Sequence, residues 1–234
     1  MTLPLERSFA LIPPNAPRLP AAPVEYDQRY VDTLTGILRQ YFNTIDNFAQ
    51  SFSSGTGGGF LQFPFISASD SAIQYATAAN TPTIVQWSTL ETGNGFTLNV
   101  GNTATAQVSG IYKITYSLQF ANNDNAAHDS IVWLRINGST SAADVPRSTT
   151  IFTLPARKSA GIPSYVCGYS EVVFSLSAGD TVGLWWGTDQ AATSGGATGN
   201  YIFYQAAQTT PMAYPAVPSA IGSITFVSAL FPTV

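Results

Sequence analysis

The side chains that most often carry out acid–base or nucleophilic chemistry are scarce in this sequence. His128 is the single histidine and Cys167 the single cysteine of 234 residues, so a serine–histidine or cysteine–histidine mechanism would have to use His128. His128 lies in a polar segment, far along the chain from Cys167 and outside any nucleophile-elbow pattern, which predicts an exposed loop histidine. The 13 acidic residues show no pairing typical of glycoside cleavage. We therefore expect no enzymatic activity.

Three other segments have compositions that occur in ligand sites. The run Gly55–Gly59 lacks the lysine and hydroxyl residue of a phosphate-binding loop and follows a predicted helix, so it predicts a hinge. The loop Asn122–Asp129 has enough oxygen atoms for a cation, but such loops are more often solvated hairpin ends. Cys167 lies in an apolar stretch, which predicts a buried, inert thiol. We expect no cofactor and assign no metal.

Trp185 and Trp186 are candidates for surface recognition. They are adjacent in a predicted strand, so their side chains must point to opposite faces of a sheet. One of them should lie in the core. The other would pack across a subunit boundary or form a sugar-stacking surface, and we favour the boundary.

The composition favours burial against neighbours. Charged residues make up 9% of the chain, against about 25% in ordinary domains. A surface with few ions is easier to desolvate, which favours an oligomer or a packed shell; the alternative is an exposed surface of small polar residues. The net charge of −4 offers no basic stripe, so we expect no nucleic-acid partner. No apolar run approaches the ~20 residues of a bilayer span, so we expect no membrane insertion.

Residues 1–25 predict an extended arm. Prolines recur through this segment and disfavour helix at each preceding residue. Apolar residues lie between the prolines, whereas a disordered tail is usually polar and charged. We expect a strap that anchors the chain to a partner's surface; the alternative is a flexible tail. The apolar residues are Leu3, Leu5, Phe9, Leu11, Ile12 and Leu19.

Residues 26–53 predict an amphipathic helix, capped by Asp27 and ended by a Gly-Ser hinge at 54–59. Apolar residues recur at alternating spacings of three and four, which is the a/d seam of a coiled coil. Bulky aromatic residues in this seam favour three strands over two. The alternative is a single helix docked on another surface. The seam residues, our expected trimer or anchor interface, are Val31, Leu34, Leu38, Tyr41, Ile45, Phe48 and Phe52.

Residues 60–234 predict an all-β head. Tyr112, Ile114, Tyr116, Leu118 and Phe120 alternate with polar residues, which indicates a strand with one buried face. The same alternation occurs in Phe96-Leu98-Val100 and in several later segments, separated by turn signals such as Thr92–Gly95 and Ser177–Asp180. Eight to ten such strands are typical of a two-sheet jelly roll.

Four segments follow one another in an order that resembles the globular heads of complement-type and tumour-necrosis-factor-like proteins. The most specific are Gly110-Ile111-Tyr112 and Leu176-Ser177-Ala178-Gly179-Asp180-Thr181-Val182, accompanied by Gly95–Leu98 and Leu134–Gly138. The resemblance covers roughly Thr81 to Leu230 and implies a jelly roll that forms trimers. The acidic calcium ligands of some members of that family have no match here.

A narrower resemblance is to virion structural proteins of tailed bacteriophages, particularly those of cyanobacteria. Ile131–Gly138 and Val145–Thr150 are similar to their trimeric β heads, Tyr214–Ile221 to their ending before the final strand, and Arg39–Asn47 to their short helix. This implies a homotrimeric virion protein assembled in the host cytoplasm. We expect a capsid decoration or cement protein whose arm and helix bind other virion proteins such as the major capsid protein. The alternative is a short fibre whose head binds a host-surface glycan.

Overall fold

The computed structural model describes residues 16–53, 63–193 and 198–229. The chain divides into two compact units, the first ending at Gln62 and the second beginning at Phe63. We describe the two units separately, as an arm–helix unit and a head.

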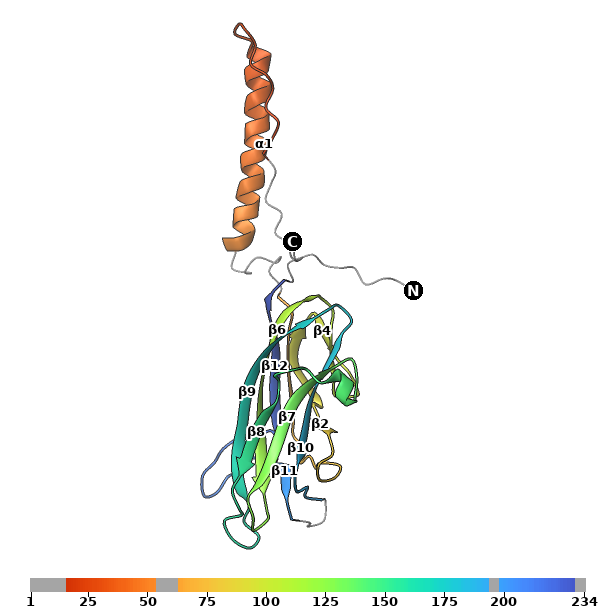
Figure 1. Cartoon of the computed structure of the whole chain (residues 1–234). Helices are drawn as coiled ribbons and strands as arrows, with labels where there is room; N and C mark the ends of the chain where they lie inside the picture. The colour runs from red at the N-terminus through yellow and green to blue at the C-terminus, as the bar shows by residue number, and fades with distance from the viewer. Residues whose placement is uncertain (1–15, 54–62, 194–197, 230–234) are drawn as a thin grey trace. The chain divides into compact units, whose positions relative to one another are not determined.

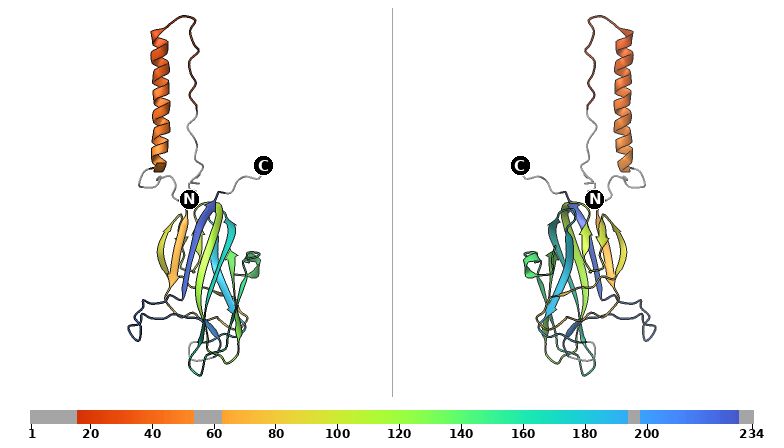
Figure 2. Two further views of the ribbon diagram at one scale, coloured as in Figure 1. Left: turned by 90° about the vertical axis from the view of Figure 1, so that its left-hand side faces the viewer. Right: turned by 90° about the vertical axis from the view of Figure 1, so that its right-hand side faces the viewer.

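The described part of the arm–helix unit contains one helix, α1 (Gln28–Ser53), of 26 residues. Asp27 caps it, because its Oδ1 accepts a hydrogen bond from the free backbone N–H of Arg29 at 2.9 Å. The predicted helix and its cap are therefore confirmed. Ahead of the helix, residues 16–27 form no helix or strand and run back alongside α1 (Figures 1 and 2).

The head is an all-β sandwich of two antiparallel sheets, the predicted jelly roll (Figure 1). In the first sheet β6 lies centrally, with β9 on one side, β12 and β11 on the other, and β1 and β3 beyond β12. In the second sheet β10 lies between β7 and the pair β5 and β2, with β8 and β4 at the ends. The strands are β1 (Phe65–Asp70), β2 (Thr83–Ile84), β3 (Thr89–Asn94), β4 (Phe96–Leu98), β5 (Ala104–Ala106), β6 (Gly110–Asn122), β7 (His128–Ile136), β8 (Thr150–Leu154), β9 (Ser164–Leu176), β10 (Thr181–Thr188), β11 (Asn200–Ile202) and β12 (Ala220–Ser228), with a short 3-10 helix η1 (Ser141–Ala143).

The long strand β6 follows the predicted alternation. Its even-numbered residues from Tyr112 to Phe120 are buried, and the odd-numbered residues between them are partly exposed. These buried side chains face the inner residues of β7 and β10 across the sandwich, including Leu134 and Trp186. The Tyr112 hydroxyl donates to the carbonyl of Val108 at 2.7 Å, and burial raises the pKa of Tyr112 to about 12. The alternation of apolar and polar residues therefore predicted the buried face of β6 correctly.

Two predictions about local structure were wrong. Val100 is fully exposed beyond the end of β4, because the chain turns there between β4 and β5. The predicted turn Thr92–Gly95 belongs mostly to β3 of the first sheet, and the chain passes to β4 of the second sheet at Gly95, whose φ is +69°. The strands β1 and β3 carry no clear alternation in the sequence. They become strands because β12 and β1 supply their backbone hydrogen-bond partners.

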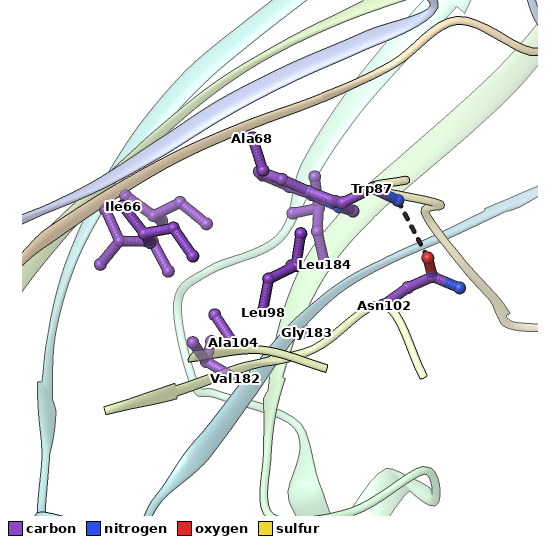
Figure 3. Close-up of a pocket in the computed structure, with 11 residues that line it drawn as sticks. Ile66, Ala68, Trp87, Leu98, Asn102, Ala104, Val182, Gly183 and Leu184 are labelled. Carbon is purple, nitrogen blue, oxygen red and sulfur yellow. Dashed lines mark hydrogen bonds between the residues drawn. The ribbon is translucent and has the colours of Figure 1, made fainter. Parts of the chain in front are cut away.

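A glycine permits Trp87, in the segment between β2 and β3, to approach the first sheet closely. A Cβ on Gly222 of β12 would lie 1.7 Å from the Trp87 ring, so the indole packs directly on the strand backbone. Trp87, which is 9% exposed, borders a small apolar cavity of about 20 Å³ with Leu98, Leu184 and Asn102 (Figure 3). The Asn102 side-chain oxygen accepts the backbone N–H of Trp87 at 3.1 Å and so holds this segment over the sheet.

Candidate functional sites

The predicted seam of α1 lies on one face of the helix. Leu34, Leu38, Tyr41 and Ile45 are partly buried, while Val31 is 40% exposed. Residues on the opposite side, such as Asn43 and Asn47, are exposed. The side chains of Phe48 and Phe52 lie outside the described residues. Within one chain the seam therefore remains an incompletely covered apolar stripe.

The arm contacts α1 near the start of the helix. The Tyr30 hydroxyl donates to the carbonyl of Pro20 at 3.5 Å, and Pro17 and Pro20 are partly buried. Over residues 16–25 the arm thus follows its own helix, which the sequence did not predict. The apolar residues of the arm before Asn15 lie outside the described residues.

Trp186 cannot be a surface-recognition residue. Its side chain is 0% exposed and packs against Phe120 in the core, with ring centroids 6.0 Å apart. The expectation that one tryptophan of the pair lies in the core is therefore confirmed. The prediction that Trp186 takes part in surface recognition was wrong. Trp185 points to the outer face of the second sheet, opposite Trp133 of β7.

Arg135 occupies the outer face beside Trp185. It is 4% exposed, and its guanidinium carbon lies 4.4 Å from the Trp185 ring centroid and 5.4 Å from that of Trp133. Asp144, in the segment after η1, accepts hydrogen bonds from Arg135 Nε at 2.6 Å and from Trp133 Nε1 at 2.8 Å. Arg135 also donates to the carbonyl of Ser139. The guanidinium therefore fixes the β7–β8 segment to the sheet.

This arrangement limits what Trp185 can bind. One side of its ring is covered by the guanidinium, a geometry favoured by cation–π attraction. Its indole N–H is buried and has no hydrogen-bond partner among the described residues. The hydrogen bond from Arg135 is the main reason that the pKa of Asp144 is lowered. The sequence offered no signal for this cluster, because its members come together only through strand register and the β7–β8 segment.

The outer face of the first sheet carries exposed apolar side chains in a setting with few charges. Tyr169 and Val173 of β9 and Ile221 of β12 are between 43% and 59% exposed. Strand register places Ser117 of β6 between Ile221 and Tyr169, so these residues form one continuous row. Lys113 and Glu171 pair with each other at 3.5 Å on this face. We call this surface the β9–β12 face.

Cys167 also lies on this face, contrary to the prediction of a buried thiol. It is an odd-numbered residue of β9, and the odd-numbered residues of that strand point outward. Ser117 and the side-chain amide of Gln119 lie within 3.3 and 3.6 Å of its sulfur. Its position in the alternation of β9 therefore determines its exposure, whereas its apolar neighbours in the sequence had indicated burial.

His128 is enclosed rather than exposed, so that prediction was also wrong. Its side chain is 15% exposed and lies between Asp124 and Asp189, at 2.9 Å and 3.3 Å. Asp124 further accepts the backbone N–H of Asn125. In the part of the chain that the structure describes, no cluster of His, Cys, Asp or Glu could hold a metal ion.

An aromatic cluster gathers where β9 begins and β11 ends. Ring centroids of Tyr165 and Phe203 lie 4.8 Å apart, and Tyr201 lies 6.3 Å from Phe203 and 5.9 Å from Tyr75. Lys158 lies 5.9 Å from the Tyr165 ring, which is 48% exposed. Burial and the neighbouring Tyr165 and Tyr75 raise the pKa of Tyr201 to about 12. This cluster could not be predicted from the sequence, because its members are far apart along the chain.

These features define the class of protein as a two-sheet jelly roll preceded by one N-terminal helix. Within the described residues, no helix is long and apolar enough to cross a membrane. No protein-family model and no curated protein matches the chain. Among solved structures it is similar to the globular domain of the zebrafish complement 1qA protein. The match has a TM-score of 0.42 and 13% identity, and covers 72% of this chain and 100% of that one.

Proposed function

We propose that the chain is a non-enzymatic, homotrimeric structural protein of a tailed-phage virion, acting as a capsid decoration or cement protein. The observation that carries the self-association is the incompletely covered seam of α1. Leucine and isoleucine side chains that stay partly exposed in one chain gain about 25 cal/mol for each Å² that a neighbouring copy removes from water. The assignment to a phage virion rests on the resemblance of the head segments and of Arg39–Asn47.

The head supplies a second surface for self-association. The β9–β12 face combines exposed apolar side chains with few charges, as the buried centres of protein interfaces do. Lys113 and Glu171 neutralise each other and would not leave an unpaired charge in a contact. Two weak contacts in one molecule act at high effective concentration, so they hold a trimer more firmly than either alone.

Anchoring is assigned to the arm and helix. Three arms that bind a capsid together gain from the same multivalency, so modest individual contacts give a durable hold. Because residues 16–25 run beside α1, the arm would meet the capsid as part of an arm–helix bundle. The head would then be the exposed portion.

The test is electron cryo-microscopy of virions that contain the full chain or a variant lacking residues 1–25. We expect trimers of the full chain at capsid three-folds or capsomer junctions, and a folded trimer of the shortened chain that does not join particles. Normal incorporation of the shortened chain would contradict anchoring by the arm. Density confined to the tail would contradict the decoration role.

The alternative function, a short tail or head fibre that binds a host-surface glycan, is favoured by the aromatic cluster around Tyr165. Partly exposed aromatic rings beside a lysine can stack on sugar rings and pair with their polar groups. This role predicts that the full chain binds host cells or lipopolysaccharide, and that Tyr165→Ala weakens the binding. No binding by the wild-type chain would exclude it.

A further inference from the structure

The single histidine joins two loops of the head. His128 begins β7, Asp124 lies in the preceding β6–β7 loop, and Asp189 directly follows β10. The Nε2 atom of His128 lies 2.9 Å from Asp124 Oδ2, and its Nδ1 atom lies 3.3 Å from Asp189 Oδ2. Two carboxylates that are 65 residues apart in the sequence therefore hold opposite sides of one imidazole ring.

The proton count of the ring follows from this geometry. An ionised carboxylate can only accept hydrogen bonds, so both ring nitrogens must donate for both contacts to form. Only the imidazolium has two N–H groups. When the ring loses one proton, one contact becomes an approach between a nitrogen lone pair and a carboxylate oxygen. That contact is then repulsive, and it favours separation of the two loops.

Further hydrogen bonds extend this junction. Asp189 Oδ1 accepts the backbone N–H of Asp129 at 3.0 Å, and the Asp129 carboxylate accepts the Thr153 hydroxyl. On the other side, the backbone N–H of Arg157 donates to the carbonyl of Asp124 at 2.7 Å. The charged groups around His128 are thus Asp124, Asp189, Asp129 and, at the β8–β9 loop, Arg157.

The balance of these groups favours the charged ring. Burial lowers the pKa of His128, but hydrogen bonds to Asp124 and Asp189 and their negative charges outweigh burial, so the pKa is raised above 6.5. The hydrogen bond from His128 is the main reason that the pKa of Asp124 is lowered below 3.8. His128 and Asp124 therefore both carry charge between about pH 4 and pH 6.5.

We propose that His128, Asp124 and Asp189 form a proton-operated latch, which holds the β6–β7 loop to the segment after β10 while the imidazole carries two protons. As pH rises through the pKa of His128, the ring loses one proton and the latch opens. As pH falls through the lowered pKa of Asp124, that carboxylate is neutralised and the latch loosens from the other side.

The test is an NMR titration of the full chain combined with amide hydrogen exchange. Because the chain has one histidine, its ring C–H signals need no assignment among several. We expect a titration midpoint above 6.5. Protection of the Asp129 and Asp189 amides, corrected for intrinsic base catalysis, should fall several-fold across that midpoint. A midpoint at or below 6.5, or protection that stays constant while the ring titrates, would overturn the proposal.

Two variants separate the latch from a general pH effect. Asp189→Asn removes one charge and should lower the titration midpoint of His128. Asp46→Asn changes an exposed carboxyl on α1 in the same way and should leave the midpoint unchanged. His128→Gln has no imidazole to titrate, so its corrected loop protection should stay constant across the pH range in which the wild-type histidine titrates. If His128→Gln fails to fold, the titration of the wild-type chain and its comparison with Asp189→Asn still test the latch.

Discussion

Arg135 carries a buried positive charge that a few neighbouring residues stabilise. Its side chain is 4% exposed, and Asp144 is its carboxylate partner at 2.6 Å. A buried charge without a partner costs several kcal/mol, because solvation is lost and nothing replaces it. The two tryptophan rings reduce this cost but carry no full charge. Asp144 is therefore the residue on which the β7–β8 segment depends most.

We predict that Asp144→Ala lowers the free energy of unfolding by about 2 kcal/mol, a value between those of exposed and fully buried pairs because Asp144 is 40% exposed. Urea denaturation measures this change. The double variant Arg135→Met, Asp144→Ala should recover part of the loss, because the uncompensated charge is gone. A double variant that is less stable by the sum of both single changes would argue against a coupled pair.

The same pair gives an acid-dependent stability. The pKa of Asp144 is lowered in the folded protein, so its contribution is present above the unfolded value of 3.8 and is lost as pH falls through the folded value. The stability difference between wild type and Asp144→Asn should therefore shrink below about pH 4.

A single glycine decides how closely Trp87 approaches the first sheet. A Cβ on Gly222 would lie 1.7 Å from the indole, so Gly222→Ala must displace the ring. We predict a loss of about 2 kcal/mol and a fall in Tm of roughly 4–8 °C. Gly101→Ala is the matched control, because no atom lies within 4 Å of the Cβ that it adds. Equal Tm values for both variants would contradict direct packing of Trp87 on β12.

At the scale of elements, α1 is an amphipathic helix whose stability depends on what covers its seam. Isolated helices are marginal in water, and most helical stability in proteins comes from packing of the apolar face. Leu38 and Ile45 are partly buried in one chain, and Asn43 and Asn47 on the other side are exposed. The two pairs of positions offer a matched test of the seam.

We predict that Leu38→Asp with Ile45→Asp breaks or loosens the proposed trimer, because two carboxylates from each of its three chains would meet in an apolar seam. Native mass spectrometry measures the oligomer. Asn43→Asp with Asn47→Asp adds the same charge on the exposed face and should leave the mass of the oligomer unchanged. If the seam variant kept the wild-type mass, the helix would not be a self-association element.

At the scale of the whole molecule, the chain joins two units that each present an apolar surface with few charges. Because only 9% of the residues are charged, electrostatic repulsion between copies of the chain opposes contact of these surfaces only weakly. If both surfaces mediate self-association, loss of one should weaken the trimer and loss of both should abolish it.

We predict that Val173→Asp, on the β9–β12 face, makes the proposed trimer dissociate at higher protein concentration, with its dissociation constant raised roughly tenfold for each 1.4 kcal/mol lost. Sedimentation or light scattering over a concentration series measures the shift. Val100→Asp is the control, because Val100 is fully exposed in a turn away from that face. A change of equal size in both variants would indicate a general effect of charge.

The sequence by itself determined the elements whose signals are local. Period-two alternation predicted β6, the a/d spacing predicted α1, and a short carboxylate at Asp27 predicted its cap. These patterns succeed because side-chain direction within a helix or strand is set by backbone geometry alone. The two-sheet architecture followed from the number of such strands and the turns between them.

Only the tertiary structure decided which residues meet. The Arg135 cluster, the enclosure of His128, the exposure of Cys167 and the aromatic cluster all depend on strand register, or on loops that join distant parts of the chain. A strand such as β3 forms because a neighbouring strand offers hydrogen bonds, although its own residues lack alternation. Burial and pairing are properties of packed neighbours, so they become definite only when distant segments are brought together.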